Sequence, residues 1–329
     1  METSLEFSRW KENPRGVGYR RWAIITTGMR HVLRIQHFRV LLFASGASGL
    51  LMASLAFAFS QSVATGGWLE ALASNFGPRA EAIAKAVGAM VLLYPDVCIR
   101  GLYTIIFWLQ SFSGLWLSLL GMTAILPQLV ARDRASQALT IYLSRPLTSY
   151  DYLVGKLGII VGVLFLTWTG PLVGGWLLSL LLAPGRDFIA FSIEPLGRAL
   201  LFNGIGLLAL ASIALGVSAF NKTSRGTIML WIGLWVIAGA VASFPHAPDF
   251  VRQVSFTYDL TQIRKEAFRL DTVLSDIADT LPLLSRNISD NLTRISQRSA
   301  ATNTAGAAAG LAGLVALSCA VFFRKLRPE

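Results

Sequence analysis

A short stretch of this sequence, between Val130 and Lys156, contains six charged residues and three tyrosines. The stretch reads VARDRASQALTIYLSRPLTSYDYLVGK and separates two long runs that contain no charged residue. Arginine and tyrosine side chains supply much of the binding free energy at protein interfaces, and complementary charges select the partner. The chemistry that this stretch indicates is therefore the recognition of another protein in the adjacent water.

Groups suited to catalysis or metal binding are sparse in the rest of the chain. Cys98 and Cys319 are expected at different depths, so we predict neither a disulfide nor a metal site from them. The sequence contains no GxxxxGK[ST] phosphate loop. A membrane enzyme remains an alternative, but it would depend on loop residues such as Asp96, His246 or Asp249, which have no paired spacing. We predict no catalytic residue, cofactor site or metal site on this chain.

The composition indicates a membrane protein. Hydrophobic residues make up 54% of the chain and charged residues only 14%, with a mean hydropathy of +0.57. Six windows contain no Asp, Glu, Lys or Arg, and each can cross a hydrocarbon core of about 30 Å as a helix. Helices are required because lipid offers no partner to backbone polar groups. The windows are 40–60, 103–130, 157–182, 199–220, 226–244 and 304–323.

The distribution of charge predicts which ends of these windows face the cytoplasm. With a cytoplasmic N-terminus, the inner connections carry 17 Lys and Arg against 6 Asp and Glu, whereas the outer connections carry 12 of each kind. The whole net charge of +11 then lies on the inner side, in agreement with the positive-inside rule. This basic excess would face anionic lipid headgroups, so it requires no nucleic acid.

The expected fold is therefore all-α: a polytopic membrane protein with six transmembrane helices and with both termini in the cytoplasm. Residues 1–39 form a cytoplasmic lead, in which the pattern from Arg20 predicts an amphipathic helix on the membrane surface; a partly ordered basic tail is the alternative. Spans one to five occupy 40–244 and an extracytoplasmic helical segment occupies 245–303. The sixth span and a cytoplasmic tail occupy 304–329.

The inner connection 131–156 is expected to be structured. Asp133 can cap a short helix, which ends before Pro146 because the residue before a proline is pushed out of helical geometry. Thr148 or Ser149 can cap a second helix, which continues through Tyr152 into the third span. Lys156 lies at the water boundary, where its side chain can extend to the headgroups. The alternative is a plain inner loop that only satisfies the charge rule.

Part of this connection resembles a known family. The run LSRPLTSYDYLVGK, residues 143–156, is similar to the signature of ABC transporter permeases of the type-2 (type V exporter) family. The layout of six spans, basic lead helix and long last outer loop resembles that family over the whole chain, whereas specific residues match over 130–160. Family members usually carry Glu-Arg and Gly-Thr-Leu upstream of this run. Here the sequence departs from that pattern, with Asp133-Arg134 in place of the first pair and Gln137-Ala138 in place of Gly-Thr, whereas Leu139 is retained.

The resemblance implies a role and a set of partners. Such a permease would form half of a transmembrane export pathway with a second copy or a related permease, in the cytoplasmic membrane of a prokaryote. Two copies of a separate ATP-binding subunit would dock on the inner connection and would hold the ATP and Mg²⁺. No nucleic acid partner is expected. The docking residues would be Arg132, Asp133, Arg134, Gln137, Leu139, Tyr142, Arg145 and Pro146.

The segment before the last span indicates a competing function. From Leu260 to Ile288, apolar residues alternate at spacings of three and four, as in a coiled-coil seam. Pro282 is expected to divide the seam into two helices. The seam would pack as a hairpin on the protein's own outer surface, or it would contact a second copy or an external protein. In the last case the chain would be a membrane scaffold that does not transport and binds through 260–295.

Small residues are spaced for close helix packing, and one proline is expected to disturb a span. Residues four apart lie on one helix face, where small side chains let two backbones approach closely. The sequence leaves open whether internal packing or a dimer uses each pair. Pro171 is expected to kink the third span. The pairs are Ser45/Gly49, Gly158/Gly162, Gly170/Gly174 and Gly306/Gly310.

Overall fold

The computed structural model describes residues 16–61, 71, 73–131, 133, 149–183, 185–221, 223–244, 248–280, 293–297 and 303–326. Every regular element within these ranges is a helix, so the all-α prediction is confirmed for them. The helices are α1 (Val17–Arg34), α2 (Gln36–Ser60), α4 (Pro78–Leu93), α5 (Pro95–Leu126), α8 (Ser149–Leu164), α9 (Gly170–Leu182), α10 (Arg186–Phe220), α11 (Ser224–Ser243), α12 (Asp249–Arg252), α13 (Phe256–Phe268), α14 (Leu270–Thr280) and α16 (Thr304–Leu326), with the π-helical turns η2 (Pro127–Ala131) and η3 (Phe165–Thr169).

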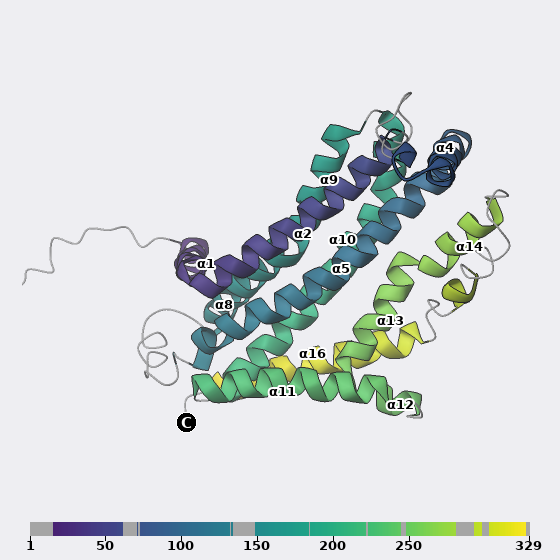
Figure 1. Cartoon of the computed structure of the whole chain (residues 1–329). Helices are drawn as coiled ribbons and strands as arrows, with labels where there is room; N and C mark the ends of the chain where they lie inside the picture. Colours follow the sequence, from purple (N-terminus) through teal and green to yellow (C-terminus); the bar gives the residue numbers. More distant parts are fainter. Residues whose placement is uncertain are drawn as a thin grey trace, which may run out of the picture.

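Six helical stretches are long and apolar enough to cross a membrane. Each overlaps one of the charge-free windows, so the prediction of a multi-pass protein with six spans is confirmed by the length and composition of the helices. α2, α5, α9 and α10 run alongside one another in Figure 1. The stretches are Gln36–Ser60, Pro95–Leu129, Tyr150–Leu182, Arg186–Phe220, Ser224–Ser243 and Thr304–Arg324.

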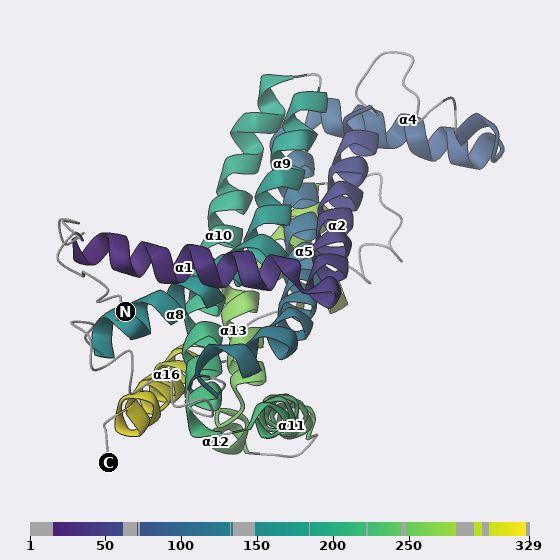
Figure 2. The same ribbon diagram turned by 90° about the vertical axis from the view of Figure 1, so that its left-hand side faces the viewer.

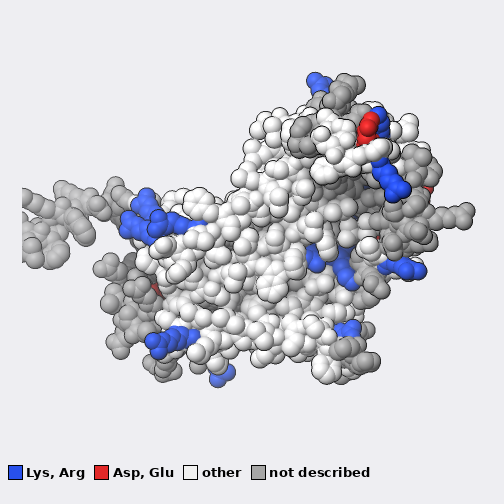
Figure 3. Space-filling view, in the orientation of Figure 1, with Lys and Arg blue, Asp and Glu red and all other residues white. Residues whose placement is uncertain are grey.

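The ends of the helices fall on two sides of the molecule. In Figure 1, α1, the start of α8 and the C-terminus lie toward the left, whereas α4, α12 and α14 lie toward the right. Figure 3 shows Lys and Arg gathered toward these two sides, with a broad uncharged surface between them. An uncharged belt between two charged rims is the surface expected of a protein that crosses a bilayer.

α1 lies across the bundle rather than along it, as Figure 2 shows. The helix ends at Arg34, and Ile35 has an extended backbone, with φ −70° and ψ 121°. α2 begins at the next residue, Gln36. A single extended residue therefore turns the chain from the crosswise helix into the first span.

Two spans begin well before the windows that identified them. α5 starts at Pro95 and α10 at Arg186, so both helices contain charged residues in their first turns. Glu194 of α10 bonds Arg198 one turn later, at 2.5 Å, which stabilises the added helix. Residues 183–198, expected as an outer connection, are therefore helical from Arg186 onward.

Proline accompanies both π turns. η2 begins at Pro127, and η3 lies just before Pro171, between α8 and α9. The Pro171 ring crowds the preceding helical turn, in which η3 lies, and donates no hydrogen bond to it. At η2 the π turn instead follows the proline. The sequence predicts a kink of the third span at Pro171, and the structure has a π turn there.

α2 and α9 approach each other at glycine. A Cβ at Gly49 would lie 2.6 Å from the carbonyl oxygen of Pro171, and a Cβ at Gly175 would lie 2.7 Å from that of Gly49. Ser45 donates a hydrogen bond to the carbonyl of Thr167. The structure thus uses Ser45/Gly49 for internal packing. Internal contacts also occupy Gly158/Gly162 and Gly306/Gly310, whereas Gly174 faces open space.

The segment before the last span enters the bundle. α13 lies between α11 and α16 in Figure 2 and also contacts α10. Leu260 and Ile263 of the expected seam are buried there, and Leu270 and Leu274 are buried where α14 packs on α5. The described part of the seam therefore faces the protein's own helices. Its continuation to Ile288 lies outside the described residues.

The seam is divided earlier than its sequence predicts. α13 ends at Phe268, and Arg269 adopts a left-handed backbone with φ 45°, a conformation that ends helices. α14 then starts at Leu270. The break expected at Pro282 lies outside the described residues, and the local cause of the earlier break is the turn at Arg269.

The core is centred on Trp168 of η3. This side chain is fully buried and stacks edge-on against Phe202 of α10, which in turn contacts Phe268 of α13. Gly114 of α5 and Gly206 of α10 leave room for the indole, because a Cβ at either position would collide with it. One indole thus joins the third span to α5, α10 and α13.

Candidate functional site

The structure describes the two ends of the inner connection. η2 carries the chain to Ala131, Asp133 follows, and α8 begins at Ser149. Among the predicted docking residues, Asp133 is described. The short helix expected after it and the seven remaining docking residues lie outside the described residues: Arg132, Arg134, Gln137, Leu139, Tyr142, Arg145 and Pro146.

Asp133 is held by two side chains of α8. Its Oδ2 accepts a hydrogen bond from the Tyr152 hydroxyl at 2.8 Å, and the Nζ of Lys156 lies 2.7 Å from the same oxygen. The side chains of Lys156 and Asp133 are only 11% and 17% exposed. Tyr152 and Lys156 are four residues apart and therefore share one face of α8. Asp133 thus anchors the first end of the connection to the third span.

A second ion pair joins α8 to α1. The guanidinium of Arg21 lies 2.6 Å from Oδ1 of Asp151, whose side chain is 8% exposed. The same guanidinium lies 5.4 Å from the centroid of the Tyr150 ring, within the range of a cation–π interaction. Asp151 is in the first turn of α8, where a carboxylate also favours the positive end of the helix dipole. The second end of the connection is thus tied to α1.

Glycines let α1 lie directly on α8. A Cβ at Gly155 would lie 2.7 Å from Cγ2 of Ile24, and a Cβ at Gly158 would lie 2.5 Å from Cδ1 of Ile25. Gly28 makes similar room on α1 for a side chain of α8. Each isoleucine therefore packs on bare backbone of the opposite helix. Shape as well as charge holds the crosswise helix in place.

We call Arg21, Asp133, Asp151, Tyr152 and Lys156 the charge frame. It links three elements at one end of the bundle: the end of α5, the start of α8 and α1. Both of its carboxylates contact a cation in a largely buried setting, where loss of one partner is costly. The charge frame therefore ties the two described ends of the connection to each other and to α1.

Sequence reasoning identified Asp133 but missed its partners. Lys156, expected to extend to lipid headgroups, turns inward because Asp133 offers it an ion pair. Arg21 and Asp151 are 130 residues apart, and only the contact of α1 with α8 brings them together. The available signal was the spacing of Tyr152 and Lys156, which places a donor and a cation on one helix face.

A second polar site lies in α13. Asp259 is 1% exposed, and its Oδ1 has no hydrogen-bond partner among the described residues. Burial raises the pKa of this carboxyl to about 7. A Cβ at Gly310 of α16 would lie 2.6 Å from its Oδ2. Arg264 stacks over Trp108 and Phe112 of α5, at 4.7 and 5.4 Å from the ring centroids. The charge-free windows do not include these groups, because α13 belongs to a segment expected outside the bundle.

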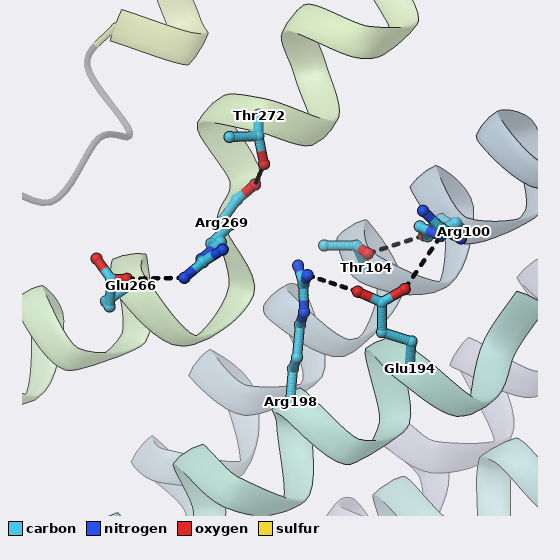
Figure 4. A network of polar contacts seen from close by, with 7 residues as sticks. All are labelled: Arg100, Thr104, Glu194, Arg198, Glu266, Arg269 and Thr272. Carbon is cyan, nitrogen blue, oxygen red and sulfur yellow. Dashed lines mark hydrogen bonds and ion pairs between the residues drawn. The ribbon is translucent and has the colours of Figure 1, made fainter.

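Figure 4 shows a third set of polar contacts, at the end of the bundle away from the charge frame. Glu194 of α10 pairs with Arg198 and, at 3.3 Å, with Arg100 of α5, and Glu266 of α13 pairs with Arg269 at 3.5 Å. All of these side chains are appreciably exposed. Exposed ion pairs contribute little to stability. Arg100–Glu194 joins α5 to α10, whereas the other two pairs connect residues three or four apart in the sequence.

Within the described ranges, no group of three or more His, Cys, Asp or Glu residues is placed to hold a metal ion. A scan against protein-family models and a search of curated proteins found no match to this chain. Its function is therefore inferred from its own residues. Among the described residues, the charge frame joins elements at the two ends of the connection that the sequence predicts to bind a partner.

Proposed function

We propose that this chain is the permease subunit of an ATP-driven transporter of the type-2 ABC class, an exporter whose ATP-binding subunit is a separate protein. The connection 131–156 is the seat of that subunit. The six apolar helices support a multi-pass membrane protein, and the run 143–156 supports the family. Since the chain has no phosphate loop, ATP and Mg²⁺ bind to the partner.

The observation that carries this proposal is the charge frame. A docking segment that receives a mechanical stroke has to be fastened at both ends to the helices that it moves. Asp133 fastens the first end to α8 through Tyr152 and Lys156. Asp151 fastens the second end to α1 through Arg21. Movement of the segment then tilts spans two and three together with α1.

In this proposal, the end of the bundle that holds α1 and the C-terminus faces the cytoplasm, and α1 lies on the inner membrane surface. The positive excess of the inner connections supports this orientation. α4, α12 and α14 then face the outside. A second permease, identical or related, completes the pathway in the cytoplasmic membrane of a prokaryote.

Co-purification with the ATP-binding subunit tests the proposal. The tagged permease is purified from its host in mild detergent, and the bound ATPase is measured by its activity and amount. Arg134→Glu reverses a charge of the segment, and Tyr142→Ala removes an aromatic anchor. Each is expected to lower the bound ATPase about tenfold or more, because loss of an interface anchor costs about 2 kcal/mol.

Arg225→Glu is the matched control, because Arg225 is an exposed arginine at the start of α11, outside the docking segment. The Arg225→Glu variant should bind as much ATPase as the unchanged permease. Full binding and full activity in both Arg134→Glu and Tyr142→Ala would refute the docking assignment. Binding of an external protein that is lost on deletion of 260–295, with no ATPase present, would favour the scaffold function instead.

A further inference from the structure

An apolar groove runs along the outside of the bundle between α2 and α9. Its volume is about 810 Å³, and the two helices lie side by side in both Figure 1 and Figure 2. Phe43 and Leu50 of α2 and Leu178 of α9 line its walls, and Leu33 of α1 lies at one end. The groove therefore starts at the crosswise helix and follows the first span.

Glycine creates this groove. At Gly46 and Gly174, an added Cβ would meet no atom within 4 Å, so both positions open onto empty space. Deeper in, Gly49 and Gly175 bring the backbones of α2 and α9 into contact and close the floor. The result is a furrow with apolar walls and a smooth backbone floor, a shape that suits a flexible alkyl chain.

One lining residue, Arg39, is charged. It lies at the α1 end of the groove, where its Nη2 donates to the carbonyl oxygen of Arg34 at 3.5 Å. The ion pairs within the described ranges involve neither Arg34 nor Arg39. Arg34 is exposed on the last turn of α1 and Arg39 lies on the first turn of α2, so both belong to the end of the groove at which α1 crosses the first span. Basic side chains at such a position can reach lipid headgroups.

We propose that the groove binds one molecule of an anionic phospholipid, with an acyl chain between α2 and α9 and with the phosphate at Arg39 and Arg34. The acyl chain covers the apolar walls. The phosphate supplies the negative charge that the two arginines do not receive from the described chain, and the planar guanidinium matches phosphate geometry. The site is separate from the docking segment, so it applies to a transporter and to a scaffold alike.

A second copy of this chain fits the groove less well. Two copies related by a two-fold axis present the same surface to each other, and this surface carries Arg34 and Arg39. Self-association through the groove would therefore bury Arg39 of both copies in the interface, and the described residues that line the groove include no carboxylate to pair with them. An apolar helix of another protein would leave the two arginines equally unpaired. A lipid phosphate pairs them.

Native mass spectrometry of the full chain tests this site. The delipidated protein in detergent is titrated with palmitoyl-oleoyl phosphatidylglycerol and, separately, with zwitterionic palmitoyl-oleoyl phosphatidylcholine. We expect one phosphatidylglycerol molecule to bind more tightly than any phosphatidylcholine. Arg39→Gln should weaken that binding about tenfold, the effect of losing one charge-assisted hydrogen bond. Gly46→Phe should also weaken it, because the new ring fills the groove.

Two matched variants control for charge and for bulk. Arg225→Gln removes an exposed arginine of α11, and Gly233→Phe adds a ring to α11 where a Cβ meets no atom within 4 Å. Both should bind phosphatidylglycerol as the unchanged protein does. Equal binding of the two lipids, or full binding by both Arg39→Gln and Gly46→Phe, would overturn the proposal. A dimer that Gly46→Phe converts to a monomer, with unchanged lipid binding, would assign the groove to a second copy.

Discussion

Lys156 and Asp133 form the ion pair that holds the first end of the proposed docking segment. If Lys156 becomes Met, the Asp133 carboxylate stays largely buried and keeps the Tyr152 hydroxyl, which does not neutralise its charge. We expect Lys156→Met to lower the free energy of unfolding by about 2 kcal/mol, the cost of removing the cation from a largely buried ion pair. Unfolding in detergent, followed by tryptophan fluorescence, measures this change.

An exposed ion pair serves as the control for the Lys156→Met prediction. Lys85 and Glu81 of α4 lie 2.6 Å apart, but their side chains are 56% and 37% exposed. Lys85→Met should therefore cost no more than about 0.5 kcal/mol. The double variant Asp133→Asn/Lys156→Met should be more stable than the sum of its single variants indicates, because it removes both charges. Additive losses would show that the two side chains are not coupled.

Asp259 makes stability depend on pH. It lies in α13, outside the six candidate spans, and burial raises the pKa of its carboxyl from 3.8 to about 7. Between these values the folded protein holds a proton that the unfolded chain has lost, so stability from this group falls as the pH rises from about 4 to about 7 and is level above that. The difference in unfolding midpoint between the unchanged protein and Asp259→Asn, measured across this range, should show that decline.

Asp276→Asn is the control for this pH profile, because Asp276 is exposed on α14. Its profile should follow that of the unchanged protein. Parallel profiles for the unchanged protein and Asp259→Asn would mean that Asp259 is not protonated in the folded state, and hence that α13 does not carry it into an apolar site.

At the scale of elements, α1 and α8 form one unit because isoleucine side chains of α1 pack on the glycine backbone of α8. A Cβ at Gly155 would lie 3.0 Å from the Cβ of Ile24, which cannot rotate away. We expect Gly155→Val to displace α1 and to cost about 1–3 kcal/mol. A lower unfolding midpoint and faster tryptic cleavage within α1, seen in limited proteolysis, would report this displacement.

Gly174→Val is the matched control for Gly155→Val. It places the same β-branched residue inside a helix of the same span, so the intrinsic helical cost is equal, but its Cβ would meet no atom within 4 Å. It should leave the cleavage of α1 unchanged. Equal cleavage rates in the two variants would show that the α1–α8 contact is not tight.

At the scale of the whole molecule, the two ends of the bundle should face different compartments. In a chain in which Cys98 and Cys319 are replaced by Ser, Ser136→Cys and Asp276→Cys each introduce one thiol. A membrane-impermeant maleimide applied to intact cells should label Asp276→Cys and leave Ser136→Cys unlabelled until the cells are opened. The positive excess of the inner connections is the reason. External labelling of Ser136→Cys would contradict the proposed orientation and would place the proposed docking segment outside the cytoplasm.

Local composition determined the class and the number of spans. Crossing a bilayer is a property of about 20 consecutive residues, so charge-free windows are sufficient to find the six helices. The starts of the helices were less predictable. In α10, Glu194 pairs with Arg198 one turn later and with Arg100 of α5. A search for charge-free windows does not detect helical turns that contain such charged pairs.

Tertiary structure alone decided which groups meet. Asp133 was identifiable as part of a charged segment, but the sequence does not show that Lys156 turns inward to it or that Asp151 receives Arg21 from 130 residues away. Asp259 likewise enters the bundle because α13 packs between other helices. Transfer into lipid depends on neighbours in sequence, whereas ion pairs and packing depend on neighbours in space, and only the folded chain brings those together.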